Sequence, residues 1–222
     1  MGLSVYKECW EAETMDEAKR KILFRLKSRI FRGRFKKEFE ESGKREALAI
    51  SEFVDQYAVV LDLGCGVGRV AKYLGPFVRE CHGVDGSEKM IQYAKYNCQK
   101  LSNVHFKVNN GMDLRLYPDN TFNFVYSLLM LQHLKKEDAL NYIAEVYRVL
   151  KNDGGTLLQF PDRSSPVYWI CHLYNLIDRS PAKMRFYTQK EAELTLKRAG
   201  FKNIKKIPLT KNEINLLATK SV

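Results

Sequence analysis

The chain has 222 residues, 45% of them hydrophobic and 28% charged, which is enough for one domain with a sizeable core. It contains no apolar run of about 18 residues, and its first residues lack the apolar centre of a signal peptide, so we expect neither a membrane-spanning helix nor a secretory leader. The five cysteines are scattered without Cys-x-x-Cys spacing, which argues against a disulfide or zinc framework and predicts a cytoplasmic protein with reduced thiols.

The positive charge is concentrated near the N-terminus. Of the net charge of +11, residues 19–45 contribute most, because they hold 12 Lys or Arg against three acids. Two interpretations stay open. This segment is either a solvated amphipathic lid over a ligand or a docking surface for an anionic partner, such as RNA, acidic lipid or an anionic substrate.

Hydrophobic spacing predicts strands and helices in alternation. The N-terminal part is predicted to be helical over residues 14–45, with Thr14 as its cap, and again over 44–55. Strands are predicted over 58–63, 78–84, 104–108, 122–128, 156–160, 201–207 and 213–219, and helices over about 68–75, 87–101, 136–150 and 188–199. Ser87 and Thr188 fit the N-cap position of the helices that they begin. This order predicts an α/β fold with a doubly wound, mostly parallel sheet. A turn is predicted at 152–155, and an aromatic insert spans 162–187.

The most informative stretch is residues 59–68, an apolar strand that leads into glycines at positions 64, 66 and 68 and then into a helix. Such a junction brings the backbone close to a nucleotide-like ligand, because glycine lacks a Cβ atom and accepts a positive φ. A dinucleotide fingerprint needs its third glycine at position 69, which is Arg69. The Gly-Lys-Ser/Thr of a phosphate-binding loop is absent as well.

The remaining pattern, Asp-x-Gly-x-Gly-x-Gly, closely resembles motif I of the class I S-adenosylmethionine-dependent methyltransferases. The segments 118–123 and 150–155 resemble the family's lead into its fourth strand and its turn before the fifth. The resemblance covers roughly residues 45–220. It implies a Rossmann-like methyltransferase fold with a seven-stranded sheet whose last strand is antiparallel. It also implies S-adenosylmethionine as cofactor and S-adenosylhomocysteine as product. We therefore expect a basic helical lid at 1–43 and a cofactor-binding domain at 44–222, with a substrate-side insert at 162–187.

Asp85 is the residue we expect to bind the ribose of the cofactor. It ends the second predicted strand, 21 residues after Gly64, and a carboxylate at this distance is placed to accept both ribose hydroxyls. The resemblance adds Asp62 as support for the glycine loop near the methionine ammonium, and main-chain contacts from the ends of the third and fourth strands. The cofactor-binding residues expected are Asp62, Gly64, Cys65, Gly66, Gly68, Asp85, Gly86, Ser87, Met90, Gly111, Met112, Asp113, Ser127 and Leu128.

One of these positions departs from the family pattern. The adenine loop usually reads Gly-Asp-Ala, whereas here the residues are Asn110-Gly111-Met112, so the acid that binds adenine is missing from its usual place. We expect the Met112 main chain to take part, with Asp113 as a substitute acid.

The sequence gives weaker signals for the residues that bind the methyl acceptor. The resemblance implies a substrate or catalytic role for His133, the candidate general base, with Gln132 beside it. Tyr168 and Trp169, in the aromatic insert, are candidates for the substrate pocket, although buried structural packing explains them equally well. No metal site is predicted.

Absent motifs narrow the acceptor. No Asn/Asp-Pro-Pro-Tyr follows the fourth strand, and no Pro-Cys occurs, which argues against the usual adenine, glutamine and cytosine-C5 acceptors. We expect a small-molecule acceptor. The alternatives are an RNA or protein methyltransferase recruited by the basic helix, and a non-catalytic sensor or scaffold that binds the cofactor. The sequence does not indicate the atom methylated or the oligomeric state.

Overall fold

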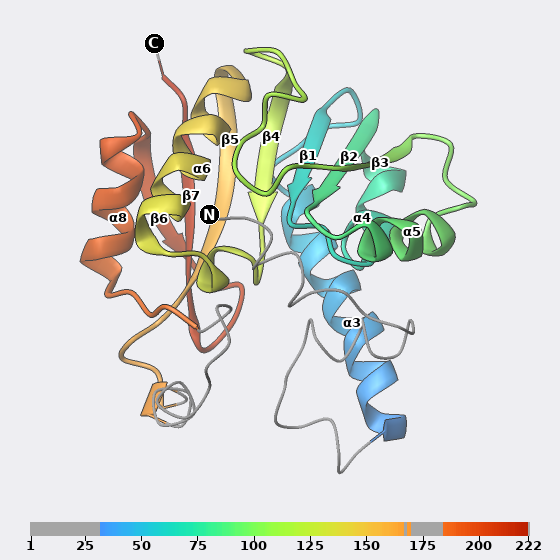
Figure 1. Ribbon diagram of the computed structural model, residues 1–222, viewed down its shortest axis with the longest axis horizontal. Helices are drawn as coiled ribbons and strands as arrows, with labels where there is room; N and C mark the ends of the chain where they lie inside the picture. The colour runs from blue at the N-terminus through green and yellow to red at the C-terminus, as the bar shows by residue number, and fades with distance from the viewer. Residues whose placement is uncertain (1–31, 167, 170–183, 222) are drawn as a thin grey trace. The chain divides into compact units, whose positions relative to one another are not determined.

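The computed structural model describes residues 32–166, 168–169 and 184–221 (Figure 1). Most of the predicted helix at 14–45, with its cap Thr14, and most of the aromatic insert lie outside these residues. Within them, the helices include none long and apolar enough to cross a membrane. The described chain divides into two compact units, which meet in sequence at Gly111 and Met112.

The first unit carries three parallel strands and the helices that cover them. Its elements are α3 (Arg32–Ser51), β1 (Val59–Leu63), α4 (Ala71–Leu74), η1 (Gly75–Phe77), β2 (Glu80–Asp85), α5 (Glu88–Asn97) and β3 (Val104–Val108). Strand β2 pairs in parallel with both β1 and β3. All five residues of β1 are buried, as a central parallel strand requires. The helices α4 and α5 contact β2, and α3 contacts α4.

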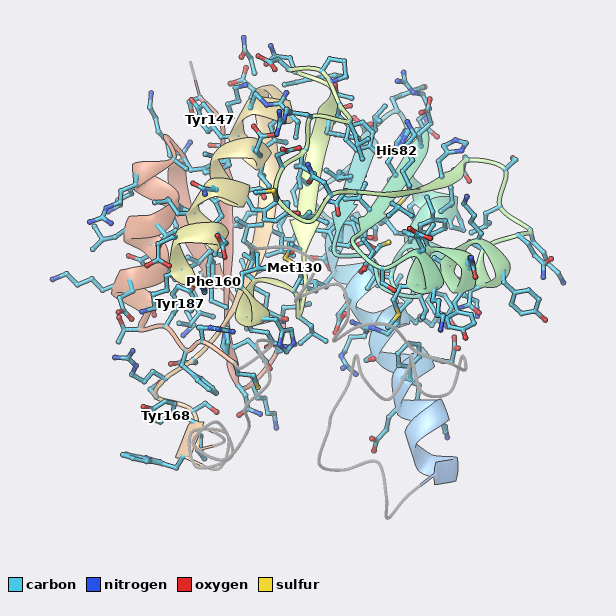
Figure 2. All side chains as sticks on the ribbon, viewed as in Figure 1. His82, Met130, Tyr147, Phe160, Tyr168 and Tyr187 are labelled. Atoms are coloured by element: carbon cyan, nitrogen blue, oxygen red, sulfur yellow. The ribbon has the colours of Figure 1, made fainter. Side chains whose placement is uncertain are left out.

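The second unit is built on four strands. Its elements are β4 (Phe122–Ser127), η2 (Leu131–His133), α6 (Lys136–Val149), β5 (Leu150–Pro161), α8 (Gln189–Arg198), β6 (Lys202–Ile207) and β7 (Glu213–Thr219). Strand β5 pairs in parallel with β4 and antiparallel with β7, which also pairs antiparallel with β6. Helix α6 contacts β5, and α8 contacts β6 and β7. Phe160 of β5 packs edge-on against Tyr187, with ring centroids 5.0 Å apart (Figure 2).

The strand order is β3-β2-β1-β4-β5-β7-β6, with β7 antiparallel to β5. This confirms the predicted seven-stranded, mostly parallel sheet with an antiparallel last strand. The boundaries of β3 and β7 agree with the prediction to the residue, and Ser87 caps α5 as expected by accepting a hydrogen bond from the Met90 N–H.

The predicted helix break at residue 44 and the predicted turn at 152–155 are wrong. Helix α3 runs without a break to Ser51, so no second helix begins at residue 44. The predicted turn at 152–155 lies inside β5, where it forms an irregularity in the pairing with β4. Asp153 takes a φ of 61° there and donates its N–H to the carbonyl of Lys220. The strand continues because this hydrogen bond and that from Lys220 N–H to Gly154 O pair the segment with the chain after β7.

Candidate functional site

The glycine loop follows β1 and has the backbone geometry that its sequence demands. Gly64, Gly66 and Gly68 all have positive φ, of 77°, 52° and 73°. A side chain at these positions would be strained, which explains why the pattern alternates glycine with other residues. The N–H groups of Gly64 and Cys65 donate to the carbonyl of Val84 in β2, so the loop is held to the end of the neighbouring strand.

Asp85 connects the glycine loop to the beginning of α5. Its Oδ2 accepts the N–H of Gly66 at 3.0 Å, and its Oδ1 accepts the N–H of Ser87 at 2.9 Å. Asp85 is partly exposed, and a carboxylate has two oxygens that can each accept more than one hydrogen bond, so a ligand's hydroxyl groups can reach it. The same carboxylate therefore fixes the loop and is available to a ribose.

Gly86, the next residue, is not tightly packed. A Cβ built on Gly86 would meet only Asn109 Oδ1 at 3.9 Å and Gly111 Cα at 4.0 Å. Asn109 accepts the N–H of Gly111 through its side chain, and its own N–H donates to the carbonyl of Asp85. Asn109 was not among the predicted residues. Its signal in the sequence is an amide at the end of a strand, two residues before a glycine, which is the pattern of an Asx turn.

Further predicted residues of this unit are buried. Asp62 is 4% exposed near the end of β1, and Met90 is buried on α5. Cys65, within the glycine loop, is buried as well, and desolvation, and then the charges of Asp62 and Asp85, raise the pKa of its thiol well above the usual value. The Cys65 thiol therefore stays protonated near neutral pH and is not an activated nucleophile.

Arg69, which directly follows the loop, is a residue that sequence reasoning missed. Its guanidinium is buried and donates to Ser42 Oγ at 2.9 Å and to Glu46 Oε2 at 2.6 Å, both on α3. It also lies over the ring of Phe39, with 5.7 Å from its Cζ to the ring centroid. A Cβ on Gly43 would lie 2.6 Å from the Arg69 carbonyl oxygen, so glycine permits this close approach. Helix α3 is thus attached to the glycine loop by buried contacts.

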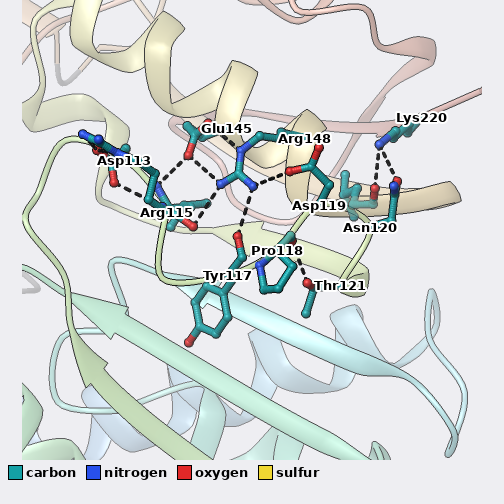
Figure 3. Close-up of polar contacts among 12 residues, drawn as sticks. Asp113, Arg115, Tyr117, Pro118, Asp119, Asn120, Thr121, Glu145, Arg148 and Lys220 are labelled. Carbon is teal, nitrogen blue, oxygen red and sulfur yellow. Dashed lines mark hydrogen bonds and ion pairs between the residues drawn. The ribbon is translucent and has the colours of Figure 1, made fainter.

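The second unit begins with residues 112–121, which precede β4 and contain no helix. Arg148 of α6 holds this segment in place (Figure 3). The Arg148 guanidinium donates to both carboxylate oxygens of Glu145, to Asp119 Oδ1 at 2.7 Å, and to the carbonyls of Leu114 and Tyr117. Glu145 accepts the Leu114 N–H as well. The hydrogen bonds from Arg148 lower the pKa of the Glu145 carboxyl group, which favours its charged form.

Met112 and Asp113 begin this segment. Met112 is largely exposed, whereas the Asp113 carboxylate turns back onto Arg115, with 2.6 Å between Oδ2 and Nη2. Asp113 Oδ1 also accepts the Arg115 N–H at 3.1 Å. The acid that we expected to replace the family's adenine-binding residue is therefore engaged by a neighbouring arginine, with which a ligand would compete.

The end of β4 holds the predicted Ser127 and Leu128, both buried. The next residue, Leu129, has a φ of 61° and donates its N–H to Gln159 Oε1 at 2.9 Å. Gln159 lies on β5 and was not predicted. A single glutamine within an apolar strand gives no indication of which distant residue it contacts.

Gln132 and His133 form a pair on η2. The Gln132 amide nitrogen lies 3.0 Å from His133 Nε2. As an amide nitrogen only donates, this assignment makes Nε2 the acceptor and places the proton of a neutral imidazole on Nδ1. Arg185 binds the main chain of both residues, its N–H donating to the Gln132 carbonyl and its Nη1 to the His133 carbonyl. The pair is thus held at a fixed place in its unit.

The two aromatic candidates differ in exposure. Tyr168 is half-buried and packs edge-on against Phe186, with centroids 5.0 Å apart. Trp169 contacts Tyr168 but is 67% exposed. Across the described ranges of the chain, no cluster of His, Cys, Asp or Glu has the arrangement of a metal site.

Residues 60–154 match a family model described as a methyltransferase domain. The chain is 30% identical over 152 residues to the uncharacterized methyltransferase YcgJ of Bacillus subtilis, a match that covers 66% of this chain and 59% of that protein. It is 26% identical over 162 residues to the demethylmenaquinone methyltransferase of Tropheryma whipplei, with 65% of this chain and 66% of that protein covered. The chain therefore spans less than two thirds of the length of these relatives.

Solved structures share the fold. The crystal structure of YcgJ superposes with a TM-score of 0.62 at 21% identity and covers 79% of this chain and 98% of its own. A structure from Methanosarcina mazei, titled as SAM-dependent methyltransferases, gives a TM-score of 0.64 at 20% identity and covers 78% of this chain and 97% of its own. At these identities the likeness extends to the fold alone.

Proposed function

Because the chain belongs to the class I S-adenosylmethionine-dependent methyltransferase family, we propose that it transfers a methyl group from S-adenosylmethionine to a small-molecule acceptor. The observation that supports this most directly is Asp85, which accepts hydrogen bonds from the glycine loop and from the start of α5 and is partly exposed. The names of two relatives point to the same acceptor class, demethylmenaquinone methyltransferase and the sterol 24-C-methyltransferase of Kluyveromyces lactis.

The residues of the first unit fit the cofactor. Gly86 directly follows Asp85, and its surroundings include the Asn109–Gly111 turn, so hydrogen-bonding groups lie near the position that we propose for the ribose. In our proposal Asp85 binds the ribose, the glycine loop and Asp62 bind the methionine part, and Met90 and Gly111 border the adenine. The family resemblance adds Ser127, Leu128, Met112 and Asp113 as further cofactor contacts in our proposal.

When bound, S-adenosylmethionine supplies a methyl group on a positively charged sulfur, which is a good leaving group. The protein's own residues therefore have to orient the acceptor and exclude water more than they have to activate the methyl group. We propose that Gln132 and His133 bind the acceptor, with Tyr168 and Trp169 bordering it. His133 acts as a base only for an acceptor that must lose a proton, and its Nε2 then exchanges the Gln132 hydrogen bond for one to the acceptor.

The basic N-terminal block keeps its two interpretations. In its described part, the exposed Lys37, Lys44 and Arg45 alternate with the exposed Glu38 and Glu41, and Lys37 pairs with Glu41 at 3.8 Å. This mixed surface does not favour a nucleic-acid acceptor over a small molecule. RNA or protein methylation remains an alternative for which the test is binding with steep salt dependence.

We also propose a cytoplasmic location, on the argument that thiols stay free in a reducing compartment. Cys65, Cys81 and Cys98 are buried thiols that form no disulfide. Oxidation of these thiols in protein taken directly from cells would contradict the proposal.

The test is calorimetric titration of S-adenosylhomocysteine into the wild type and two variants. Asp85→Ala removes the proposed ribose acceptor, and we expect affinity to fall about ten- to hundredfold, the equivalent of one or two hydrogen bonds to a charged group. Asp55→Ala, an exposed aspartate of the same unit, is the matched control and should bind like wild type. A folded wild type that does not bind would overturn the proposal.

Turnover separates an enzyme from a sensor. With binding established, the wild type is supplied with S-adenosylmethionine and a panel of small-molecule acceptors, and the release of S-adenosylhomocysteine is followed. Release that depends on one acceptor supports the proposed reaction. Tight cofactor binding without turnover across acceptors, RNA and protein would favour the non-catalytic alternative.

A further inference from the structure

Leu129 has an unfavourable backbone conformation at the end of β4. Four residues other than glycine in the described ranges have positive φ, and three of them are Asn or Asp, which tolerate this region. Leu129, at 61°, is the exception. A left-handed conformation brings the Cβ of a leucine close to the following carbonyl oxygen, so the surrounding structure has to hold it in place.

Gln159 supplies that restraint. It lies on β5 with 3% of its surface exposed, and its Oε1 accepts the Leu129 N–H at 2.9 Å. The hydrogen bond is partly buried, so water competes less for the Leu129 N–H group than it would at the surface. Gln159 therefore contacts the turn directly at its strained residue.

The orientation of the Gln159 amide is itself fixed by two neighbours. Its Nε2 donates to Asn215 Oδ1 at 3.0 Å and to Thr210 Oγ1 at 3.3 Å, and Asn215 Nδ2 donates to the same hydroxyl at 3.0 Å. Asn215 is fully buried on β7 and pairs with Gln159 across the two strands. If the Gln159 amide turned over, its NH₂ group would meet the Leu129 N–H and its oxygen would meet Asn215 Oδ1. The network thus permits one orientation, with the oxygen toward Leu129.

We infer that Gln159 is a positioning residue for methyl transfer, which holds Leu129 in its left-handed conformation and so sets the path of residues 127–133. This inference rests on the proposed function. Leu129 lies between the proposed cofactor contacts Ser127 and Leu128 and the proposed acceptor pair Gln132 and His133. Buried amides are costly unless they are fully hydrogen-bonded, and apolar residues on β5 and β7 would avoid that cost. The hydrogen bond to Leu129 is a reason, beyond packing, for buried amides at Gln159 and Asn215.

The experiment measures S-adenosylhomocysteine affinity in a double-mutant cycle. Gln159→Leu removes the acceptor and should weaken binding about tenfold, the equivalent of one buried hydrogen bond. Leu129→Gly removes the strain, because glycine takes this φ freely, and should bind within about threefold of wild type. In the Leu129→Gly background, Gln159→Leu should then cost little, about twofold or less. Thr210→Val is the matched control, since it disturbs the network but leaves the Leu129 hydrogen bond.

Each outcome has a distinct meaning. A wild type that binds, with Gln159→Leu binding equally well, overturns the inference and leaves the proposed function standing. An equal loss in both backgrounds also overturns it, because Gln159 then acts through general packing. A folded wild type that does not bind overturns the proposed function and the inference together. If Gln159→Leu does not fold, Gln159→Met, which is unbranched and close to glutamine in volume, takes its place. Hydrogen exchange at the Leu129 amide, fast in the variant and slow in wild type, supports the inference independently of ligand.

Discussion

At the scale of single residues, charged side chains beside the glycine loop have two kinds of task. Asp85 accepts two loop N–H groups and remains partly exposed, whereas the Arg69 guanidinium is buried against Glu46 with 2.6 Å between Nη2 and Oε2. Burying two charges costs hydration energy that their attraction only partly offsets, so such a pair is weak evidence for stability on its own. Removing one partner is a different matter, because it leaves the other charge buried and unpaired.

Arg69→Met is therefore expected to lower the free energy of unfolding by about 3–5 kcal/mol, as for other broken buried pairs. Glu46→Leu should have a similar effect, and the double variant should be more stable than either single one, since no uncompensated charge remains. Urea unfolding of the four proteins measures the coupling. Lys37→Ala, which removes an exposed pair with Glu41, is the control and should change stability by less than about 1 kcal/mol. Additive losses at Arg69 and Glu46 would contradict the pairing.

Two glycines of the first unit are expected to respond to alanine in opposite ways. A Cβ on Gly83, in β2, would lie 2.5 Å from Phe106 Cδ1, so Gly83→Ala forces the core apart and should cost about 1–3 kcal/mol of stability. Gly86→Ala meets no atom closer than 3.9 Å and should leave stability nearly unchanged. Because Gly86 borders the proposed ribose site, it should instead weaken S-adenosylhomocysteine binding. Thermal unfolding and calorimetry on both variants separate the effects; a Gly86→Ala protein that binds like wild type would place the ligand elsewhere.

At the scale of secondary-structure elements, helix α8 shows how local sequence fixes a helix start. Thr188 caps it by accepting the Glu191 N–H, and the Glu191 carboxylate in turn accepts the Thr188 N–H at 2.7 Å. Glu191 also pairs with Lys136 at 3.0 Å. The backbone hydrogen bond from Thr188 is the main reason that the pKa of the Glu191 carboxyl group falls to about 2, with the Lys136 contact contributing.

This depressed pKa predicts a pH dependence with a definite sign. In the unfolded chain Glu191 titrates near 4.5, so the folded protein gains stability from the charged carboxylate above that pH and loses it as the pH falls toward about 2. Glu191→Gln should flatten the dependence of unfolding free energy on pH in this window. The variant should lose less stability relative to wild type at pH 2 than at pH 7. Thr188→Ala should cost about 1 kcal/mol at neutral pH through loss of the cap. Urea unfolding from pH 2 to 7 tests both, and an unchanged slope in Glu191→Gln would refute the assignment.

The elements that the sequence predicts correctly carry their signals within a few residues. Ser87, Thr188 and the bounds of β3 and β7 follow from signals within a few residues, and they were predicted correctly. The 152–155 segment looked like a turn because Asn, Asp and Gly favour turns, but its hydrogen bonds to Lys220, far along the chain, keep it within β5.

In the candidate site, too, residues with nearby sequence signals were predicted and residues with distant partners were not. The glycine loop and Asp85 were identified by spacing along one strand–loop–helix unit. The partners of Arg69 and Gln159 lie between 23 and 56 residues away in sequence, and no periodicity or motif joins them. Interactions of this kind are set by tertiary packing, so only the structure reveals them.

At the scale of the whole molecule, the contacts of α3 bear on where the proposed cofactor-binding domain begins. The sequence predicted a lid at 1–43 and a domain from 44 onward, but α3 crosses that boundary as one helix. Phe39, with 1% of its surface exposed, and Ser42 lie on the predicted lid side and are buried. Lys72 and Tyr73 also reach back to Glu40, at 3.1 Å and 2.7 Å. These contacts favour a domain that includes the whole of α3.

We therefore expect a chain shortened to residues 44–222 to be less stable than one shortened to 32–222. The shorter chain lacks Phe39 and Ser42, which leaves the Arg69 guanidinium with Glu46 alone and opens a cavity the size of a phenyl ring. Loss of a buried phenylalanine alone costs about 3–5 kcal/mol, a large share of the stability of a typical domain. Urea unfolding of both proteins, beside the full chain, measures the difference. Phe39→Ala in the full chain is the control for the cavity and should reproduce much of the loss. Equal stability of the two shortened chains would instead support a boundary at residue 43, because the first half of α3 would then add nothing to the domain it contacts.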